Sequence, residues 1–335
     1  MRLFLAPMEG VVDHHMRDLI TQLGGVDLCV TEFVRVTDAV LPEKVFKRLC
    51  PELANGCRTQ SGTPVRIQLL GSDPEKLARN GAKAARMGAS AVDLNFGCPA
   101  KTVNSSDGGA TLLKNPNRVY EIVKAVRDAV PEPVPVTAKI RLGFSDRSSY
   151  LDNATAAWQA GANELAVHAR SKADGYKPPA YWDYIGRIRE TIDIPVIANG
   201  EIWTLDDYQR CKQQTGCTDF MLGRGLLARP DLALQIKHVE AGEPYSPLPW
   251  QAVCELLYGF YRETGDAYPE RFLGNRAKQW LMYLQRTYPQ ARALFEQIKR
   301  LRERRDFETA FAQQLENSVT MPPNTKTIMQ QGLPP

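Results

Sequence analysis

The sequence predicts an α/β fold, a (β/α)8 TIM barrel followed by a small all-helical C-terminal domain, on the basis of three observations. Eight short apolar runs rich in β-branched residues alternate with stretches of helical periodicity through about residue 230. A polar residue stands at or just after the end of each run. After about residue 250 only helical periodicity remains. Apolar strands that are each followed by a helix are typical of a parallel sheet buried on both faces, and eight repeats favour a closed barrel over an open sheet.

The predicted strands recur along the first two thirds of the chain. In chain order they are Leu3–Met8, Leu28–Glu32, Pro64–Leu70, Ala91–Asn95, Val136–Arg141, Glu164–His168, Pro195–Asn199 and Asp219–Gly223. Between them lie amphipathic stretches, such as Pro74–Met87 and Pro116–Val130, whose apolar residues recur at helical spacing. These stretches predict the helices that cover the outside of the barrel.

Polar side chains mark the carboxyl ends of the predicted strands. They are Glu9, Glu32, Gln68, Asn95, Lys139 with Arg141, His168, Asn199 and Arg224. In a (β/α)8 barrel these strand ends surround one mouth, where active sites are built. A single polar residue after a strand is usually a helix cap or a solvated loop residue. A complete series of eight instead favours a functional mouth.

The C-terminal part of the chain differs in composition. We predict a barrel domain over 1–241, a Pro- and Gly-rich linker over 242–249, a helical domain over 250–316 and a disordered tail over 317–335. Residues 271–305 hold ten Lys or Arg and two Glu, a local charge of +8, with few acidic partners at helical spacing. Such charge is typical of a polyanion-binding surface. Five interleaved aromatic residues are expected in the core of the bundle: Phe272, Trp280, Tyr283, Tyr288 and Phe295.

The composition of the 335-residue chain, 43% hydrophobic and 24% charged, is that of a globular protein with a sizeable core. Its net charge of +4 is only a weak indication of an anionic partner. The seven cysteines form no CxxC pair, so neither a disulfide framework nor a metal site is indicated. No apolar run approaches the roughly 18 residues of a membrane span, and the N-terminus has no signal-peptide pattern. We therefore expect a cytoplasmic protein that binds neither membrane nor metal.

The strongest chemical motif is Asn95–Lys101, directly after the fourth predicted strand. Within it, Cys98 follows a glycine and precedes a proline, which predicts a rigid loop at the barrel mouth. A lone cysteine is more often a small buried apolar residue. At a barrel mouth, however, a thiol with an ordinary pKa of about 8.5 is mostly protonated at pH 7 and can act as a general acid.

Two glycine-containing segments, Asn199–Glu201 and Gly223–Gly225, follow the seventh and eighth predicted strands. Barrels that bind phosphorylated cofactors usually hold the phosphate at this position. No GxGxxG motif follows a strand, so the sequence does not indicate a Rossmann-type dinucleotide site.

As a set, these residues resemble the tRNA-dihydrouridine synthase family. The resemblance extends from residue 1 to about residue 315 and depends on motifs in a fixed order: Leu5–Gly10, Thr31–Phe33, Gln68, Asn95 with Cys98 and Pro99, Lys139 with Arg141, His168 with Arg170, Asn199 with Gly200, and Gly223 with Arg224. Within the family, Thr31–Val36, Leu41–Phe46 and Asn199–Trp203 are most similar to the bacterial C-type members, which act on uridine 16 of the D-loop. The resemblance implies a TIM barrel that binds FMN, NADPH as the reductant, and a helical domain that helps to hold tRNA.

The resemblance also implies roles in cofactor binding. Pro7, Met8 and Glu9 would lie along the flavin, and Gln68 would hydrogen-bond its pyrimidine edge. Lys139 would stand near N1 and O2, where reduction puts negative charge. The ribityl phosphate would be held by His168, Asn199, Gly200, Glu201, Gly223 and Arg224.

For the substrate, the resemblance implies reduction of the uracil 5,6-double bond, with hydride passing from N5 of FMN to C6 while Cys98 protonates C5. The extruded base would be held by Asn95, Arg141 and Tyr176. The phosphates of the tRNA would be bound by Arg35, Arg276, Lys278, Lys299 and Arg300.

Two other functions remain possible on the sequence. A barrel flavoenzyme that reduces or oxidises free pyrimidines would account for the flavin site and the cysteine, but not for the charge of 271–305. A non-catalytic RNA-binding barrel would account for the charge, but not for Cys98 together with Lys139 and Gln68. Absorption by the purified protein at flavin wavelengths would exclude the second.

Overall fold

The computed structural model of the protein describes residues 1–316. The chain divides into two compact units, one of Met1–Ser246 and one that begins at Pro247. The division lies within residues 242–249, where neither helix nor strand forms. The predicted disordered tail, residues 317–335, lies outside the described residues. No helix in the described chain is long and apolar enough to cross a bilayer.

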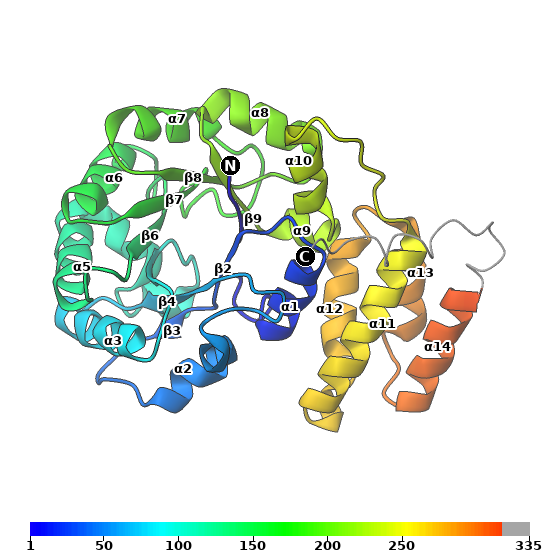
Figure 1. Cartoon of the computed structure of the whole chain (residues 1–335). Coiled ribbons are helices and arrows are strands. Elements are labelled where there is room, and N and C mark those ends of the chain that lie inside the picture. Colours follow the sequence, from blue (N-terminus) through cyan, green and yellow to red (C-terminus); the bar gives the residue numbers. More distant parts are fainter. Residues whose placement is uncertain (317–335) are drawn as a thin grey trace. The chain divides into compact units, whose positions relative to one another are not determined.

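Eight parallel strands close into a barrel, which confirms the predicted fold class (Figure 1). The strands of the ring are β1 (Leu3–Leu5), β2 (Leu28–Val30), β4 (Val65–Leu70), β5 (Val92–Phe96), β6 (Val136–Arg141), β7 (Glu164–His168), β8 (Val196–Asn199) and β9 (Asp219–Leu222). β1 pairs with both β2 and β9, and β2 also pairs with β4, so the ring closes. Because all pairings are parallel, the carboxyl ends of the strands surround one mouth.

Two strands end two or three residues earlier than predicted, and a further strand is absent from the sequence prediction. β1 ends at Leu5 because the chain turns after it, with the carbonyl of Met8 accepting two backbone hydrogen bonds. β2 ends at Val30, before the predicted end at Glu32. The additional strand β3 (Val34–Arg35) pairs in parallel with the end of β4. Two residues are too few to give a periodic pattern, which explains why the sequence does not predict it.

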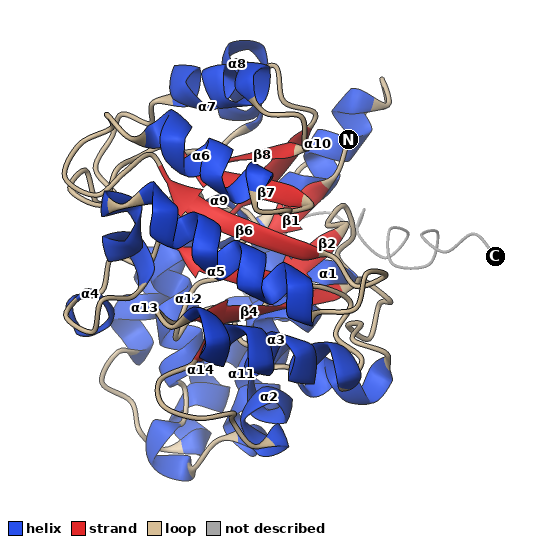
Figure 2. Cartoon of the chain, turned by 90° about the vertical axis from the view of Figure 1, so that its left-hand side faces the viewer, coloured by secondary structure: helices blue, strands red, loops and turns tan. Residues whose placement is uncertain are grey.

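The longer helices of the first unit lie outside the ring of strands (Figure 1, Figure 2). The α-helices are α1 (His14–Gln22), α2 (Glu43–Leu49), α3 (Pro74–Arg86), α4 (Lys101–Asn104), α5 (Pro116–Ala129), α6 (Tyr150–Gln159), α7 (Trp182–Thr191), α8 (Leu205–Thr215), α9 (Arg224–Ala228) and α10 (Leu232–Glu240). Two 3-10 helices, η1 (Pro51–Asn55) and η2 (Gly109–Lys114), complete the unit. Local signals begin several of them: Asp73 caps α3 by accepting from the Lys76 N–H, and Thr204 forms a reciprocal capping box at α8.

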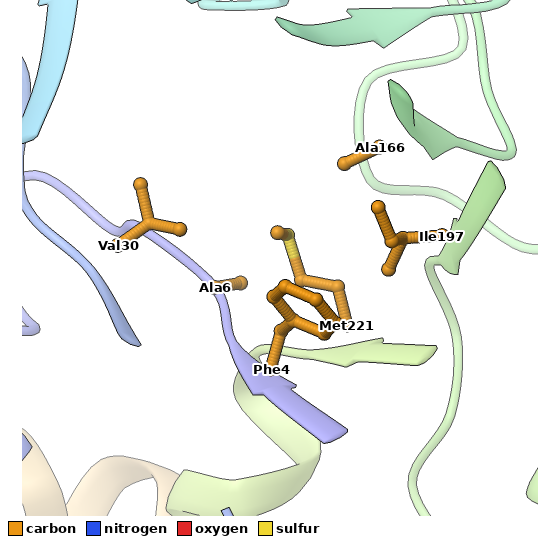
Figure 3. Close-up of a cluster of buried hydrophobic side chains, with 6 residues drawn as sticks. All are labelled: Phe4, Ala6, Val30, Ala166, Ile197 and Met221. Atoms are coloured by element: carbon orange, nitrogen blue, oxygen red, sulfur yellow. The ribbon is translucent and has the colours of Figure 1, made fainter. Parts of the chain in front are cut away.

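The inside of the barrel has an apolar and a polar part. Figure 3 shows the apolar part, which comes from β1, the residue after it, β2, β7, β8 and β9: Phe4, Ala6, Val30, Ala166, Ile197 and Met221. The three intervening strands, β4 to β6, instead contribute buried polar side chains: Arg66, Gln68, Asp93, Thr137 and Arg141. Buried polar groups are costly unless they are hydrogen-bonded. The hydrogen-bond partners of these side chains therefore decide how the side chains are arranged on this side of the barrel.

The second unit contains the predicted C-terminal helices. Its elements are α11 (Trp250–Ala267), η3 (Glu270–Phe272), α12 (Asn275–Leu284), α13 (Pro289–Ile298) and α14 (Arg304–Glu316). Phe260 and Trp280 meet edge to face in its core, with ring centroids 5.4 Å apart. Trp280 and Tyr288 are buried as expected, but Phe272 is 44% exposed. The expectation for Phe272 is wrong because this residue belongs to the 3-10 turn η3 rather than to a helix face.

Candidate active site

The loop that carries Cys98 starts at the carboxyl end of β5 and is held on both sides. Oδ1 of Asn95 accepts hydrogen bonds from the backbone N–H groups of Gly97 and Cys98, both at 2.9 Å. The Cys98 carbonyl accepts from the backbone N–H of Ala110 at 3.1 Å and from Nδ2 of Asn104 at 2.9 Å. The cysteine therefore stands on a fixed loop at the mouth of the barrel.

The Cys98 thiol differs from the other cysteines in its exposure. All seven cysteines lie within residues 1–316, and Cys98 is partly exposed whereas the other six are buried. Partial burial raises the pKa of Cys98, and the Glu9 carboxylate adds to the rise, while Arg141 and Arg35 oppose it. A thiol with a raised pKa stays protonated at neutral pH, which is the state that a proton donor requires.

Lys139 reaches across the mouth from β6 to β8. Its Nζ donates to Oδ1 of Asn199 at 3.0 Å, and Nδ2 of Asn199 donates to the Met221 carbonyl at 2.8 Å. The second bond orients the amide so that its oxygen faces the ammonium group. Burial, and then the charge of Arg141, lower the pKa of Lys139 to about 8. When an anion binds beside such a lysine, the pKa rises and the ammonium group becomes fully protonated. Lysines with a pKa lowered in this way are common in functional sites.

Cationic side chains gather around His168. They are Lys139, Arg141, Arg170 and Arg224. Burial lowers the pKa of His168 well below its ordinary value, and these four charges lower it further, so the imidazole is neutral at pH 7. Glu201 lies 2.5 Å from Arg170 and 3.7 Å from Arg224. The cations outnumber the carboxylate that joins two of them, so this side of the mouth fits a ligand that brings negative charge.

The residues after β8 have an unusual backbone. Gly200 and Glu201 have φ angles of 117° and 59°, both in the left-handed region. A Cβ at Gly200 would lie 2.8 Å from Cδ2 of His168, so only glycine fits without displacing the imidazole. After β9, a Cβ at Gly223 would meet Sδ of Met8 at 3.6 Å. The structure thus brings together predicted cofactor residues from the beginning and the end of the barrel.

Tyr176 is 54% exposed and lies close to two arginines of the mouth. The Cζ atoms of Arg141 and Arg224 lie 5.1 Å and 5.0 Å from the centre of its ring. Arg141 also donates from Nε to the Gly97 carbonyl at 2.8 Å and from Nη1 to the Ser171 carbonyl at 3.0 Å. Arg141 therefore ties the Cys98 loop to the loop that carries Tyr176, a structural role that the sequence does not predict.

The other predicted flavin residues differ in burial. Gln68 is fully buried in β4, where its amide nitrogen and oxygen both have hydrogen-bond partners. Pro7 and Met8 are half-buried in the turn after β1, and Glu9 beside them is exposed. All four residues lie at the mouth. Gln68 belongs to the barrel interior, whereas Pro7, Met8 and Glu9 belong to the turn after β1.

Arg35 is exposed at the end of β3 and contacts the segment that follows Cys98. It donates to the Thr102 carbonyl at 2.9 Å and to Oγ of Ser106 at 3.1 Å. Together with Lys76 and Ser72, it lines a pocket of about 380 Å³ between the ends of β3 and β4 and that segment. The pocket also contains acidic side chains, so its charge is mixed.

Three of the four basic residues predicted to bind RNA phosphates in the second unit have partners there: Lys278, Lys299 and Arg276, which donates to Oε1 of Gln279. Lys278 donates to the Leu301 carbonyl at 2.9 Å, its Nζ lies 5.0 Å from the ring centre of Phe307, and burial lowers its pKa. Lys299 forms an ion pair with Glu296 one helical turn earlier. Lys278 is therefore also a structural residue, which the charge pattern alone does not reveal.

The remaining basic residues of this segment are more varied. Cζ of Arg276 lies 5.8 Å from the ring centre of Phe260, and Arg300 is exposed. Arg304 pairs with Asp266 of α11 at 3.0 Å. The expectation that acidic partners are scarce needs correction at Lys299 and Arg304. Glu296, the partner of Lys299, lies three residues earlier in the chain, and Asp266, the partner of Arg304, lies on a different helix.

Three polar side chains of the site escape the sequence analysis, Asp93, Asn104 and Thr137, and Arg170 is named there only as part of a motif, without a role. Asp93 and Thr137 stand two residues before Asn95 and Lys139 on β5 and β6. Because side chains alternate along a strand, this spacing puts them on the inner face, a signal that the sequence does contain. Arg170 is buried and donates to the Lys177 carbonyl at 2.7 Å, which a sequence cannot reveal.

These features define a (β/α)8-barrel enzyme whose mouth combines a protonated thiol with a cation-rich side. The chain belongs to the dihydrouridine synthase family, because the model of that family matches residues 4–320.

Similar proteins of known name support the family. A protein named tRNA-dihydrouridine(16) synthase from Aquipseudomonas alcaligenes is 52% identical over 300 residues, which cover 90% of this chain and 95% of that protein. One of the same name from Shewanella oneidensis is 54% identical over 299 residues, with coverage of 89% and 93%.

Solved structures support the fold. The old yellow enzyme homologue from Zymomonas mobilis has a TM-score of 0.50 at 11% identity and covers 73% of this chain and 90% of its own. Histamine dehydrogenase from Rhizobium sp. 4-9 has a TM-score of 0.53 at 16% identity, with coverage of 72% and 46%. At such low identity, these likenesses establish the barrel architecture alone.

Proposed function

We propose that the protein is a tRNA-dihydrouridine synthase that reduces the 5,6-double bond of uridine 16 in the D-loop of tRNA, in the cytoplasm, with bound FMN and with NADPH as reductant. The observation that carries the proposal is the protonated thiol of Cys98 on a fixed loop, at the same barrel mouth as the four cations around His168. Relatives that are about half identical over nine tenths of the chain bear the name tRNA-dihydrouridine(16) synthase.

The mouth fits FMN by its chemistry. His168, Asn199, Gly200, Glu201, Gly223 and Arg224 would hold the phosphate end, in the region where the cations outnumber the carboxylate. Lys139 would lie at the pyrimidine edge, with Gln68 on the same side and Pro7, Met8 and Glu9 along the ring. When bound, FMN reduced by NADPH supplies the hydride for uridine reduction. The lowered pKa of Lys139 favours this role, because negative charge on a neighbouring group restores its proton.

Cys98 would protonate C5 of the uracil. The Sγ–H bond breaks as the C5–H bond forms, and the resulting thiolate recovers its proton from solvent. Burial keeps the thiol protonated beforehand, and the charges of Arg141 and Arg35 stabilise the thiolate afterwards. The fixed backbone of the loop supports the role, since a general acid must be held within reach of the atom that it protonates.

The base would be held by Asn95, Arg141 and Tyr176 after it leaves its stack. Tyr176 has an exposed ring with two arginines near it, and an exposed aromatic ring suits stacking against a pyrimidine. Arg35 beside its pocket would bind phosphate near the target, and Arg276, Lys278, Lys299 and Arg300 would bind phosphates farther along the tRNA.

The first test concerns Cys98. Cys98→Ala should leave NADPH-dependent flavin reduction unchanged and slow the single-turnover reduction of tRNA by about 10²–10⁴-fold, the usual contribution of a general acid. Stopped-flow absorbance of the flavin, first with NADPH and then with tRNA, measures both steps.

Cys254→Ala is the matched control, because Cys254 is a buried cysteine of the second unit. It should lower the melting temperature without changing either step. Wild-type reduction of tRNA by Cys98→Ala would remove the thiol from the mechanism, and the absence of flavin from freshly purified protein would refute the cofactor assignment.

A further inference from the structure

The polar side of the barrel interior contains a carboxylate that no part of the proposed reaction uses. Asp93 on β5 is 4% exposed and lies in register with Gln68 on β4 and Thr137 on β6. Oδ2 of Asp93 accepts from Nε2 of Gln68 at 2.7 Å, and Oδ1 accepts from Oγ1 of Thr137 at 2.6 Å. A buried carboxylate is costly to maintain unless it has such partners, so its presence in the core calls for a reason.

Asp93 is the last acceptor in a chain of hydrogen bonds that begins at the Cys98 loop. The backbone N–H groups of Gly97 and Cys98 donate to Oδ1 of Asn95 at 2.9 Å. Nδ2 of Asn95 donates to Oε1 of Gln68 at 2.7 Å. Nε2 of Gln68 then donates to Asp93. Every bond in the chain has its donor on the side of Cys98.

The direction of this chain matters because two of its members are amides. A carboxamide can turn over and exchange its oxygen with its nitrogen, and only its partners decide between the two orientations. An ionised carboxylate accepts and cannot donate, so Asp93 requires Gln68 to present its nitrogen inward and its oxygen to Asn95. Asn95 is then held with its oxygen toward the loop, the orientation in which it binds Gly97 and Cys98.

Opposing influences act on the charge state of the Asp93 carboxyl group. Burial raises the pKa of Asp93, but the hydrogen bonds from Gln68 and Thr137 and the charges of Arg66 and Lys139 oppose that rise. In its ionised state, Asp93 makes the bond to Gln68 charge-assisted, and such bonds are about twice as strong as those between neutral groups.

We infer that Asp93 is a positioning residue for Cys98, which it holds through Gln68 and Asn95 by fixing the direction of both amides. Its consequence for catalysis rests on the proposed function of Cys98 as proton donor. A general acid displaced by about 1 Å can lose on the order of a hundredfold in rate, so a fixed orientation is valuable. Every side-chain amide nitrogen carries two hydrogens, and these contacts use one of them in Gln68 and one in Asn95. Each of the two residues therefore keeps one amide hydrogen that is free of this chain of hydrogen bonds.

The test measures hydrogen exchange of the Gly97 and Cys98 amides in the full-length purified protein. In Asp93→Asn, the side chain can present either an oxygen or an NH2 group to Gln68, so exchange at these amides should accelerate by about five- to tenfold. Thr137→Val is the matched control, because it removes the other bond to Asp93 without touching the amides. It should lower the melting temperature and leave the exchange of the loop unchanged.

A charge exchange gives the sharper result. Gln68→Glu opposes two carboxylates and should accelerate exchange at least as much as Asp93→Asn. In Asp93→Asn/Gln68→Glu, residue 68 becomes the acceptor for both neighbours, so Asn95 recovers its orientation and exchange should return to within about twofold of wild type. Asp93→Asn would then accelerate exchange in the wild-type background and slow it in the Gln68→Glu background. A general loss of stability cannot produce both effects.

Several results would overturn the inference: unchanged exchange in Asp93→Asn, an equal acceleration in Thr137→Val, or a double variant no better than Gln68→Glu alone. Should Asp93→Asn fail to fold, Gln68→Glu and the double variant decide by themselves. Exchange is measured without tRNA or turnover, so a failure of the proposed reaction appears in the Cys98→Ala kinetics and leaves this result intact.

Discussion

At the scale of single residues, charged side chains of the site combine two tasks. Arg141 holds two loops by their carbonyl groups and also supplies charge at the mouth. Lys278 caps the carbonyl of Leu301 in a segment whose composition indicates RNA binding. Lys139 is kept beside Asn199 with a pKa of about 8. In each case burial and hydrogen bonding decide how much of the formal charge is available to a ligand.

The pKa of Lys139 predicts how flavin affinity depends on pH. In flavin-free protein the ammonium group loses its proton near pH 8. An anionic ligand binds the protonated form better, so affinity for FMN should be full well below pH 8, decline through pH 8 and be about tenfold lower near pH 9.5. Lys139→Met should bind FMN weakly with a flat profile between pH 7 and 9.5. Flavin fluorescence quenching measures both.

Lys124→Met serves as the control for this profile, because Lys124 lies on the outer helix α5 and pairs with Asp128 there. It should keep the wild-type dependence. A wild-type profile without a decline above pH 8 would argue against Lys139 as the group that meets the negative charge of the cofactor.

At the scale of elements, the functional side chains stand at the ends of the strands, and the strained backbone lies in the loops that follow. The β8 end has two consecutive residues in the left-handed region, Gly200 and Glu201, and Gly200 packs against His168. Backbone strain of this kind persists where the surroundings hold it, and it concentrates at ligand sites. The short strand β3 similarly ends at Arg35, beside the segment after Cys98.

Substituting Gly200 tests this packing. Gly200→Ala should lower the free energy of unfolding by roughly 3 kcal/mol, because it combines a strained φ with a contact to the imidazole of His168. Gly175→Ala also has a positive φ but would meet nothing within 4 Å, so it should cost only about 1 kcal/mol. Urea unfolding measures the difference, and flavin retention on dialysis should fall in Gly200→Ala alone. Equal losses would mean that contact with His168 is unimportant.

Helix α12 and the turn after α13 allow structural and RNA-binding charge to be separated. Arg300→Glu, at an exposed position, should raise the dissociation constant for tRNA and flatten its salt dependence, with a log–log slope of about −0.7 lost per phosphate contact. Lys278→Met should instead lower the free energy of unfolding by about 1 kcal/mol, because it removes the bond to the Leu301 carbonyl. Filter binding at several salt concentrations and thermal melting distinguish them; wild-type salt dependence in Arg300→Glu would remove that residue from the RNA surface.

At the scale of the whole molecule, a barrel with an asymmetric interior is joined in one chain to a helical unit. One cluster of the interior is apolar, which stabilises the ring, and the side chains from β4 to β6 are polar, which orients groups of the mouth. The proposed division of labour is that the barrel performs the reduction and that basic residues of both units hold the tRNA.

Mapping dihydrouridine in cellular tRNA tests the target. Transfer RNA from a strain that lacks this chain should be without dihydrouridine at position 16 and keep it at other positions, and a plasmid copy should restore it. The Cys98→Ala copy should not restore it, which is the matched control. Loss at another position would retain the reaction and correct the target.

The sequence by itself determines the barrel, the order of its strands and the position of Cys98. These depend on local periodicity and on residues adjacent in the chain, as at Asn95–Lys101. Which side chains meet across the barrel is decided by the tertiary structure. The bond from Gln68 to Asp93 joins residues 25 apart, and that from Lys139 to Asn199 joins residues 60 apart. Burial, pKa and the orientation of an amide depend on such distant neighbours, so only the folded chain fixes them.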